Sequence, residues 1–319
     1  MDGKSDYYKY YKQFSQEGSK IGKLMLVQQS VFQIGSVVLL FIFLVVIGIF
    51  AGIKGGSFDT EAFKTAARDP QNTQICTYLG SAAMQIIASI IFIIFARENK
   101  DIMKNAPIEG GHLSLWLMVK GWFYITAMGI VLTSITYFLG LLVGAHPGDH
   151  LLLNSDHKIL LFILTSIFPG IVEELLYRGI LFRYLRRHGF FYAALVSSVI
   201  FGLLHLNFSQ AFFAGTMGFV LCYVYDRSGH LWPCMILHAL HNGSVILLTL
   251  IDNQDVLIVP VLYLGVNCLA ALISIFFVSL KPKIVTDKTA IKKTLTATPL
   301  MILIIGILIF CTIRVIFRF

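Results

Sequence analysis

Apolar residues occur along this chain in long runs, separated by short polar segments that carry most of the charged residues. A helix needs about 20 predominantly apolar residues to cross the hydrocarbon core of a bilayer. Candidate runs lie near residues 31–53, 76–96, 114–143, 159–182, 190–206, 208–225, 231–251, 256–280 and 296–317. The pattern predicts an all-α protein, a polytopic transmembrane helical bundle with about eight or nine spans.

The same pattern divides the chain into four parts. Residues 1–30 are polar and aromatic, so we expect a cytoplasmic N-terminal tail there, and they do not resemble a removable signal peptide. Residues 31–150 are predicted to form N-terminal transmembrane helices, 151–252 a central core of helices, and 253–319 C-terminal transmembrane helices.

Composition and charge agree with a membrane location and predict an orientation. The chain is 57% hydrophobic and 13% charged, with a mean hydropathy of +0.78. Lys and Arg are concentrated in residues 1–30 and in the even-numbered connections between runs, which predicts a cytoplasmic N-terminus. The net charge of +8 reflects this bias and favours contact with anionic membrane lipid. Because no basic stripe is interleaved with aromatic residues, we expect no nucleic-acid partner.

A few polar residues lie inside the predicted spans, where a charge at a helix centre costs about 2.5–3.5 kcal/mol on insertion scales. They are Glu173, Glu174 and Arg178 in run 159–182, His205 in run 190–206, and His238, His241 and Asn242 in run 231–251. A chain that keeps such residues in its spans has a structural or functional use for them.

Helical spacing sorts these residues. Glu174 and Arg178 are four positions apart, so they lie on one helix face and can form an ion pair. Glu173 lies about 100° around the helix from Glu174 and has no such partner on its own helix. A carboxylate without a local partner is available to accept a proton from water as a general base. His238 and Asn242 are also four positions apart and form a two-point hydrogen-bonding face.

Each polar residue also has a structural interpretation. The Glu174–Arg178 pair can act as a clasp within the bundle, and His238 and Asn242 can link neighbouring helices. His205 can be an interfacial side chain at a helix end, and His241 is interpreted as structural or supporting. A structural clasp alone does not require a third charge, which favours a functional role for Glu173.

The three motifs E-E-x-x-x-R, F-x-x-x-H and H-x-x-x-N occur in this order on successive apolar segments. They comprise Glu173, Glu174 and Arg178, then Phe201 and His205, then His238 and Asn242. In this order and membrane context they resemble the CAAX protease and bacteriocin-processing family of intramembrane endopeptidases, abbreviated CPBP. The resemblance covers roughly residues 155–250, so that 151–252 is the CPBP-like catalytic core.

The resemblance implies a role for each motif residue. Glu173 would activate water, and His205 would help to hold or deprotonate that water. His238 and Asn242 would stabilise the oxyanion, while Glu174 and Arg178 would maintain the shape of the site with Phe201 in support.

Two questions of chemistry remain open. We expect no cofactor, but two histidines and a glutamate can hold catalytic zinc, and a zinc-dependent protease would use Glu173, His205 and His238. A transporter with a proton path through Glu173, or a non-catalytic membrane scaffold, is the alternative from another class of protein.

The expected partners are a peptide or lipidated-protein substrate and membrane lipid. The activity would serve peptide or lipidated-protein maturation or bacteriocin self-immunity. The expected location is a cell membrane, multi-pass, with the short loops favouring a bacterial plasma membrane. The sequence does not determine the oligomeric state.

Overall fold

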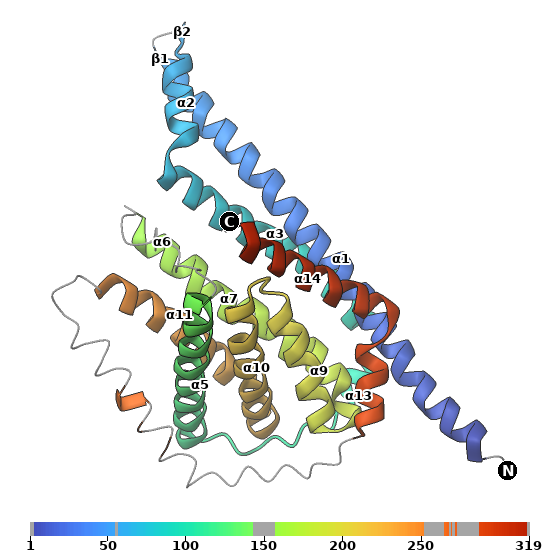
Figure 1. Ribbon diagram of the computed structural model, residues 1–319. Helices are drawn as coiled ribbons and strands as arrows, with labels where there is room; N and C mark the ends of the chain where they lie inside the picture. The colour runs from blue at the N-terminus through green and yellow to red at the C-terminus, as the bar shows by residue number, and fades with distance from the viewer. Residues whose placement is uncertain are drawn as a thin grey trace.

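The computed structural model describes residues 3–54, 57–142, 157–251, 265–267, 269, 272 and 287–317. Almost all of these residues are helical, and the helices form two groups that pack side by side (Figure 1). The predicted all-α class is therefore confirmed. The only strands in the described part of the chain are two of two residues each, β1 (Ile53–Lys54) and β2 (Ser57–Phe58), which pair antiparallel.

The first group is built on α1 (Gly3–Gly52), a single helix that runs through the predicted N-terminal tail and the first predicted span. Phe14, Ile21 and Met25, all within the predicted tail, are buried. These positions are spaced by seven and four residues, which places them on one face of the helix. Residues 3–30 are thus a helix packed against the rest of the protein.

A helical hairpin follows. The β1–β2 turn leads into α2 (Thr60–Arg68) and α3 (Pro70–Glu98), and α3 returns along α1. The Asp59 carboxylate accepts hydrogen bonds from the amides of Glu61 and Ala62 and so caps α2. Asp69 caps α3 in the same way, and Pro70 occupies the first turn, where its missing N–H is not needed.

The chain then enters the second group, which carries the candidate site. After α4 (Lys100–Lys104), α5 (Leu115–Leu142) lies beside the helices of residues 157–251. These are α6 (Lys158–Phe162), η2 (Ile163–Ile167), α7 (Phe168–Glu174), η3 (Leu175–Phe182), α8 (Arg183–Leu185), η4 (Arg186–His188), α9 (Phe190–Leu203), α10 (Phe208–Ser228) and α11 (Trp232–Ile251). The segments from α6 to η4 form one continuous helical rod, Lys158–His188.

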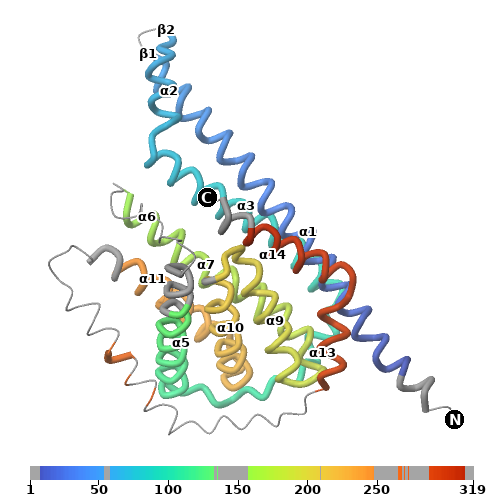
Figure 2. Tube along the Cα trace, in the orientation of Figure 1, coloured from blue at the N-terminus to red at the C-terminus, as the bar shows by residue number. Residues whose placement is uncertain are grey.

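The C-terminal helices return to the first group. Helix α13 (Lys288–Leu295) and helix α14 (Thr298–Phe317) are bent by 71° at their junction, and both pack against α1. The chain trace in Figure 2 shows α14 lying along α1, so that segments from opposite ends of the sequence are neighbours. The first group therefore contains both terminal parts of the described chain.

Four helical segments are long and apolar enough to cross a membrane: Tyr8–Gly52, Pro70–Glu98, Leu115–Leu132 and Lys158–His188. The bent pair α13–α14 makes a fifth if it is one span, and α9 is a shorter apolar helix. These candidates come from the described residues alone, and the predicted span 256–280 lies almost entirely outside them. A helical membrane protein is confirmed; eight or nine spans and a cytoplasmic N-terminus stay predictions.

Candidate active site

The helical rod Lys158–His188 carries the first motif at a change in helix type. The short α-helix α7 ends at Glu174, and the π-helix η3 begins at Leu175. A second π-helix, η2, precedes α7. Such π segments within α-helices are often found at functional sites, because the wider turn alters which side chains share a face.

The π segment η2 and a proline expose a backbone carbonyl on the side facing α11. In an α-helix the carbonyl of Thr165 would accept a hydrogen bond from the N–H of residue 169, but residue 169 is proline and has none. The side-chain amide of Asn242 in α11 donates to this carbonyl at 3.4 Å. The hydroxyl of Ser166 donates to the carbonyl of Ala239 at 2.7 Å. These bonds fix α11 against η2 and α7.

Glu174 and Arg178 form the predicted ion pair. Arg178 Nη1 lies 2.8 Å from Glu174 Oε1, and the exposed fractions of the two side chains are 1% and 0%. The guanidinium also lies over the ring of Phe201 in α9, with 4.5 Å between Arg178 Cζ and the ring centroid. Breaking a buried pair of this kind typically costs about 3–5 kcal/mol, since the remaining charge is left buried. The prediction of an i, i+4 pair is confirmed.

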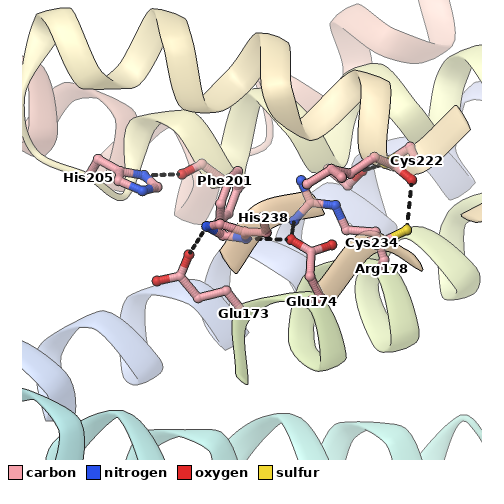
Figure 3. A network of polar contacts seen from close by, with 10 residues as sticks. Glu173, Glu174, Arg178, Phe201, His205, Cys222, Cys234 and His238 are labelled. Carbon is pink, nitrogen blue, oxygen red and sulfur yellow. Dashed lines mark hydrogen bonds and ion pairs between the residues drawn. The ribbon is translucent and has the colours of Figure 1, made fainter. Parts of the chain in front are cut away.

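His238 extends this pair toward Glu173. Its Nδ1–H donates to Glu174 Oε1 at 2.8 Å, so one carboxylate oxygen accepts from both Arg178 and His238. On the other side of the ring, His238 Nε2 lies 3.9 Å from Glu173 Oε2. Figure 3 shows the resulting chain from Arg178 through Glu174 and His238 to Glu173. Its buried end is Arg178, and its open end is Glu173, whose side chain is 21% exposed.

His205 approaches the same region from the end of α9. Its Nδ1–H donates to the carbonyl of Phe201 at 2.9 Å, which leaves Nε2 as the acceptor in the neutral ring. The Phe201 ring touches both histidines edge-on, with centroid distances of 5.0 Å to His205 and 6.1 Å to His238. Leu206 follows in the left-handed region with φ 55°, a conformation that non-glycine residues adopt mainly where the surroundings enforce it.

His238 and Asn242, which were predicted to form one two-point hydrogen-bonding face, bind different partners in the structure. His238 uses Nδ1 for Glu174, and Asn242 uses its amide for the Thr165 carbonyl, so the two side chains have separate partners. His241 is buried and packs on the ring of Phe213, with a centroid distance of 4.4 Å. The role of Thr165 was not predicted from the sequence, although Pro169 four residues later indicates a carbonyl without its α-helical donor.

The residues considered as zinc ligands do not form a compact metal-binding group. Within the described part of the chain, no three His, Cys, Asp or Glu side chains are grouped so that they could hold a metal ion. Glu173 and His238 are neighbours, but His238 also has Glu174 on its Nδ1. We therefore derive no step through a metal ion.

These features define a polytopic helical membrane protein with a polar cluster sealed in its core and a glutamate at the cluster's open end. Comparison with known proteins adds the family. Residues 155–244 match the family described as type II CAAX prenyl endopeptidase Rce1-like. The matched segment contains every motif residue from Glu173 to Asn242. Over this segment, which is less than half of the chain, the protein is similar to a family of CAAX-type membrane proteases, in agreement with the resemblance carried by the three motifs.

A curated relative shows a second similarity. The chain is 26% identical over 163 residues to the protein named "Putative membrane peptidase YdiL" of Bacillus subtilis (strain 168). The aligned part covers 50% of this chain and 67% of that protein. No solved structure matches the chain significantly.

Proposed function

We propose that the protein is an intramembrane endopeptidase in which Glu173 activates a water molecule for attack on a peptide bond. The observation that carries this proposal is the chain Arg178–Glu174–His238–Glu173, buried at one end and accessible at the other. A separation of 3.9 Å between Glu173 Oε2 and His238 Nε2 is too long for a direct hydrogen bond and suits a bridging water.

The contacts of His238 support a donor role toward the open end. Its Nδ1–H donates to Glu174, so a donor on the side facing Glu173 has to be Nε2–H, on a ring that carries hydrogen on both nitrogens. In the proposed mechanism this N–H stabilises the oxyanion, the role implied by the family resemblance.

The proposed reaction balances with the side chains present. Glu173 accepts a proton from water while the water oxygen attacks the carbonyl carbon, and His205 Nε2 accepts a hydrogen bond from the same water. The oxyanion receives hydrogen bonds from His238 Nε2–H and from Asn242, whose amide has a second N–H besides the one directed at Thr165. Glu173 then donates its proton to the departing amide nitrogen, and the C–N bond breaks.

The substrate we propose is a peptide or lipidated protein that reaches the site from the membrane. The family description names CAAX prenyl endopeptidases, which makes a prenylated peptide the first substrate to test. Peptide maturation and bacteriocin self-immunity are the roles consistent with the family, and the proposed location is a bacterial plasma membrane. No cofactor is needed for the reaction as written.

The test compares purified wild-type protein with Glu173→Gln, using one fluorescence-quenched peptide in prenylated and unmodified forms. Glu173→Gln keeps the size of the side chain and removes the base, so kcat should fall by about 10²–10⁴-fold with folded yield unchanged. Glu61→Gln is the matched control, because Glu61 lies in α2 and its side chain is 79% exposed. Substantial cleavage by Glu173→Gln rules out the general base.

The same preparation tests the zinc alternative. Wild-type activity should survive a strong chelator, and the active protein should contain no stoichiometric zinc. Loss of activity to the chelator followed by recovery with added zinc contradicts metal-free catalysis. Such a result assigns Glu173, His205 and His238 to a metal site.

A further inference from the structure

Gly218 lies in the interior of α10, where its missing side chain makes room for Arg178. Glycine in a helix interior is less favourable than alanine, so its presence there calls for a reason in the packing. A Cβ added at this position would lie 3.0 Å from Arg178 Nη2, 3.2 Å from Ser198 Oγ and 3.3 Å from Phe201 Cδ1. All three neighbours are side-chain atoms of buried residues, and they converge on one point.

Two nearby glycines have a different use. A Cβ at Gly202 would lie 2.3 Å from the carbonyl oxygen of Ala211, and one at Gly215 would lie 3.3 Å from that of Ser198. These glycines allow the backbones of α9 and α10 to approach each other. Gly218 instead faces the guanidinium of Arg178, a residue of η3.

Arg178 depends on packing for its position. Its Nη1 bonds to Glu174 and one face of its guanidinium lies on Phe201, but Nε and Nη2 are buried and have no hydrogen-bond partner among the described residues. Hydrogen bonds therefore fix only one of its three nitrogens. The ring of Phe201 and the open side of Gly218 determine where the rest of the guanidinium lies.

We infer that Gly218 is a positioning residue for the active site. The space beside Gly218 allows Arg178 to pair with Glu174. Glu174 in turn accepts a hydrogen bond from His238 and so orients its ring toward Glu173. This inference rests on the proposed function for its kinetic consequence, but the geometric part stands independently. The three atoms nearest to a Cβ at Gly218 include one of Arg178 and none of Glu173 or His238, so we expect its effect on the reaction to pass through the ion pair.

The test substitution is Gly218→Ala. Each of the three contacts made by the new Cβ is tighter than most real Cβ contacts, so Arg178 must shift by a few tenths of an ångström. Because a misplacement of about 1 Å can cost about 10²-fold in rate, we expect kcat to fall by roughly ten- to a hundredfold. KM should change little. Alanine favours the helix, which offsets part of the cost of crowding the buried side chains.

Gly306→Ala is the matched control. Gly306 is also inside a helix, α14, is exposed, and has open space where its Cβ would lie. The substitution should give the same helix-propensity effect with kcat unchanged. Equal kcat for Gly218→Ala and Gly306→Ala overturns the inference.

A second substitution tests whether crowding is the cause. Adding Ser198→Ala to Gly218→Ala removes one of the three atoms that the new Cβ meets, so part of the lost kcat should return. Adding Ser197→Ala instead should restore nothing, because Ser197 points elsewhere and donates to the carbonyl of Ala193. Equal effects of the two serine substitutions contradict the proposed crowding. If Gly218→Ala does not fold alone, recovery of folding by Ser198→Ala and not by Ser197→Ala supports the same crowding, and recovery by neither contradicts it.

Nuclear magnetic resonance gives a readout that needs no enzymatic activity. In protein with ¹³C-labelled histidine, the ring signal of His238 is assigned by its loss in His238→Ala. Gly218→Ala should move this signal and Gly306→Ala should not. An unmoved signal overturns the positioning role. Wild-type protein that cleaves neither test peptide, together with a moved signal, counts against the proposed function and leaves the positioning of His238 supported.

Discussion

The described part of the chain contains two clusters in which one glutamate is shared by an arginine and a histidine. In the core, Glu174 accepts from Arg178 and His238, each at 2.8 Å. Between the two helical groups, Glu17 of α1 accepts from Arg187 at 2.6 Å and lies 2.9 Å from His188. We call the first the core cluster and the second the junction cluster.

The two clusters differ in burial and in what lies beyond the histidine. The side chains of the core cluster are 0–2% exposed, whereas Arg187, Glu17 and His188 of the junction cluster are 27%, 14% and 15% exposed. The ring of His238 leads on to Glu173, while that of His188 packs against Phe14 and Tyr192. The same three residue types therefore orient a candidate active site in one place and connect α1 to the second helical group in the other.

The largest expected difference is in stability. Arg178→Leu leaves Glu174 charged and buried, so the free energy of unfolding should fall by about 3–5 kcal/mol. Arg187→Leu breaks a pair that water can reach, so its loss should stay within about 1 kcal/mol. Thermal unfolding in detergent and the folded yield are measured for both variants. Similar losses for both variants mean that burial does not separate the clusters.

Double variants show whether the loss comes from the pair itself. Glu174→Gln with Arg178→Gln removes both charges, so much of the stability lost by either single variant should return. The corresponding change in the junction cluster, Glu17→Gln with Arg187→Gln, should show a smaller coupling, about 0.2–1 kcal/mol. Pairs in direct contact typically couple by about 0.5–3 kcal/mol. A core coupling near zero contradicts a strong Glu174–Arg178 interaction.

The next expected difference is in catalysis. His238→Ala removes the proposed donor to the oxyanion, and loss of such a donor costs about 10²–10³-fold in kcat. His188→Ala removes a histidine with the same type of carboxylate partner, and it should leave kcat nearly unchanged. Cleavage of the quenched peptide by purified variants provides the comparison. A large kcat loss in His188→Ala means that the junction cluster takes part in the reaction.

Features of the molecule that depend on local spacing could be predicted from the sequence. The helical runs follow from apolar composition, and the Glu174–Arg178 pair follows from a separation of four residues. The π-helices η2 and η3 were not predicted, because a periodicity of one or two turns does not distinguish them from α-helix. The helix in residues 3–30 was missed because its polar and aromatic composition outweighed the apolar spacing of Phe14, Ile21 and Met25.

Contacts between helices account for the rest of what the sequence could not provide. His238 meets Glu174 across 64 positions of sequence, and spacing within α11 gives no information on that partner. Asn242 likewise meets a carbonyl of η2 that becomes accessible through Pro169. The residue types at the site were therefore predictable, whereas the order in which they contact one another required the fold.

The smallest expected effect belongs to Glu17→Gln. The substitution keeps the size of the side chain and removes the charge shared by Arg187 and His188. Because these side chains are partly exposed, the loss in stability should stay within about 1 kcal/mol. Added salt should reduce this loss further, since salt screens exposed charges and has little effect on a buried pair. Unfolding at low and high salt, with Glu174→Gln as the buried counterpart, measures both.

The junction cluster joins α1 to η4 and includes no contact with Glu173. In Glu17→Gln, kcat should therefore stay within about twofold, equivalent to about 0.4 kcal/mol. A salt-independent loss of several-fold in kcat shows instead that the contact between α1 and η4 controls the geometry of the site. The two clusters would then both be needed for activity.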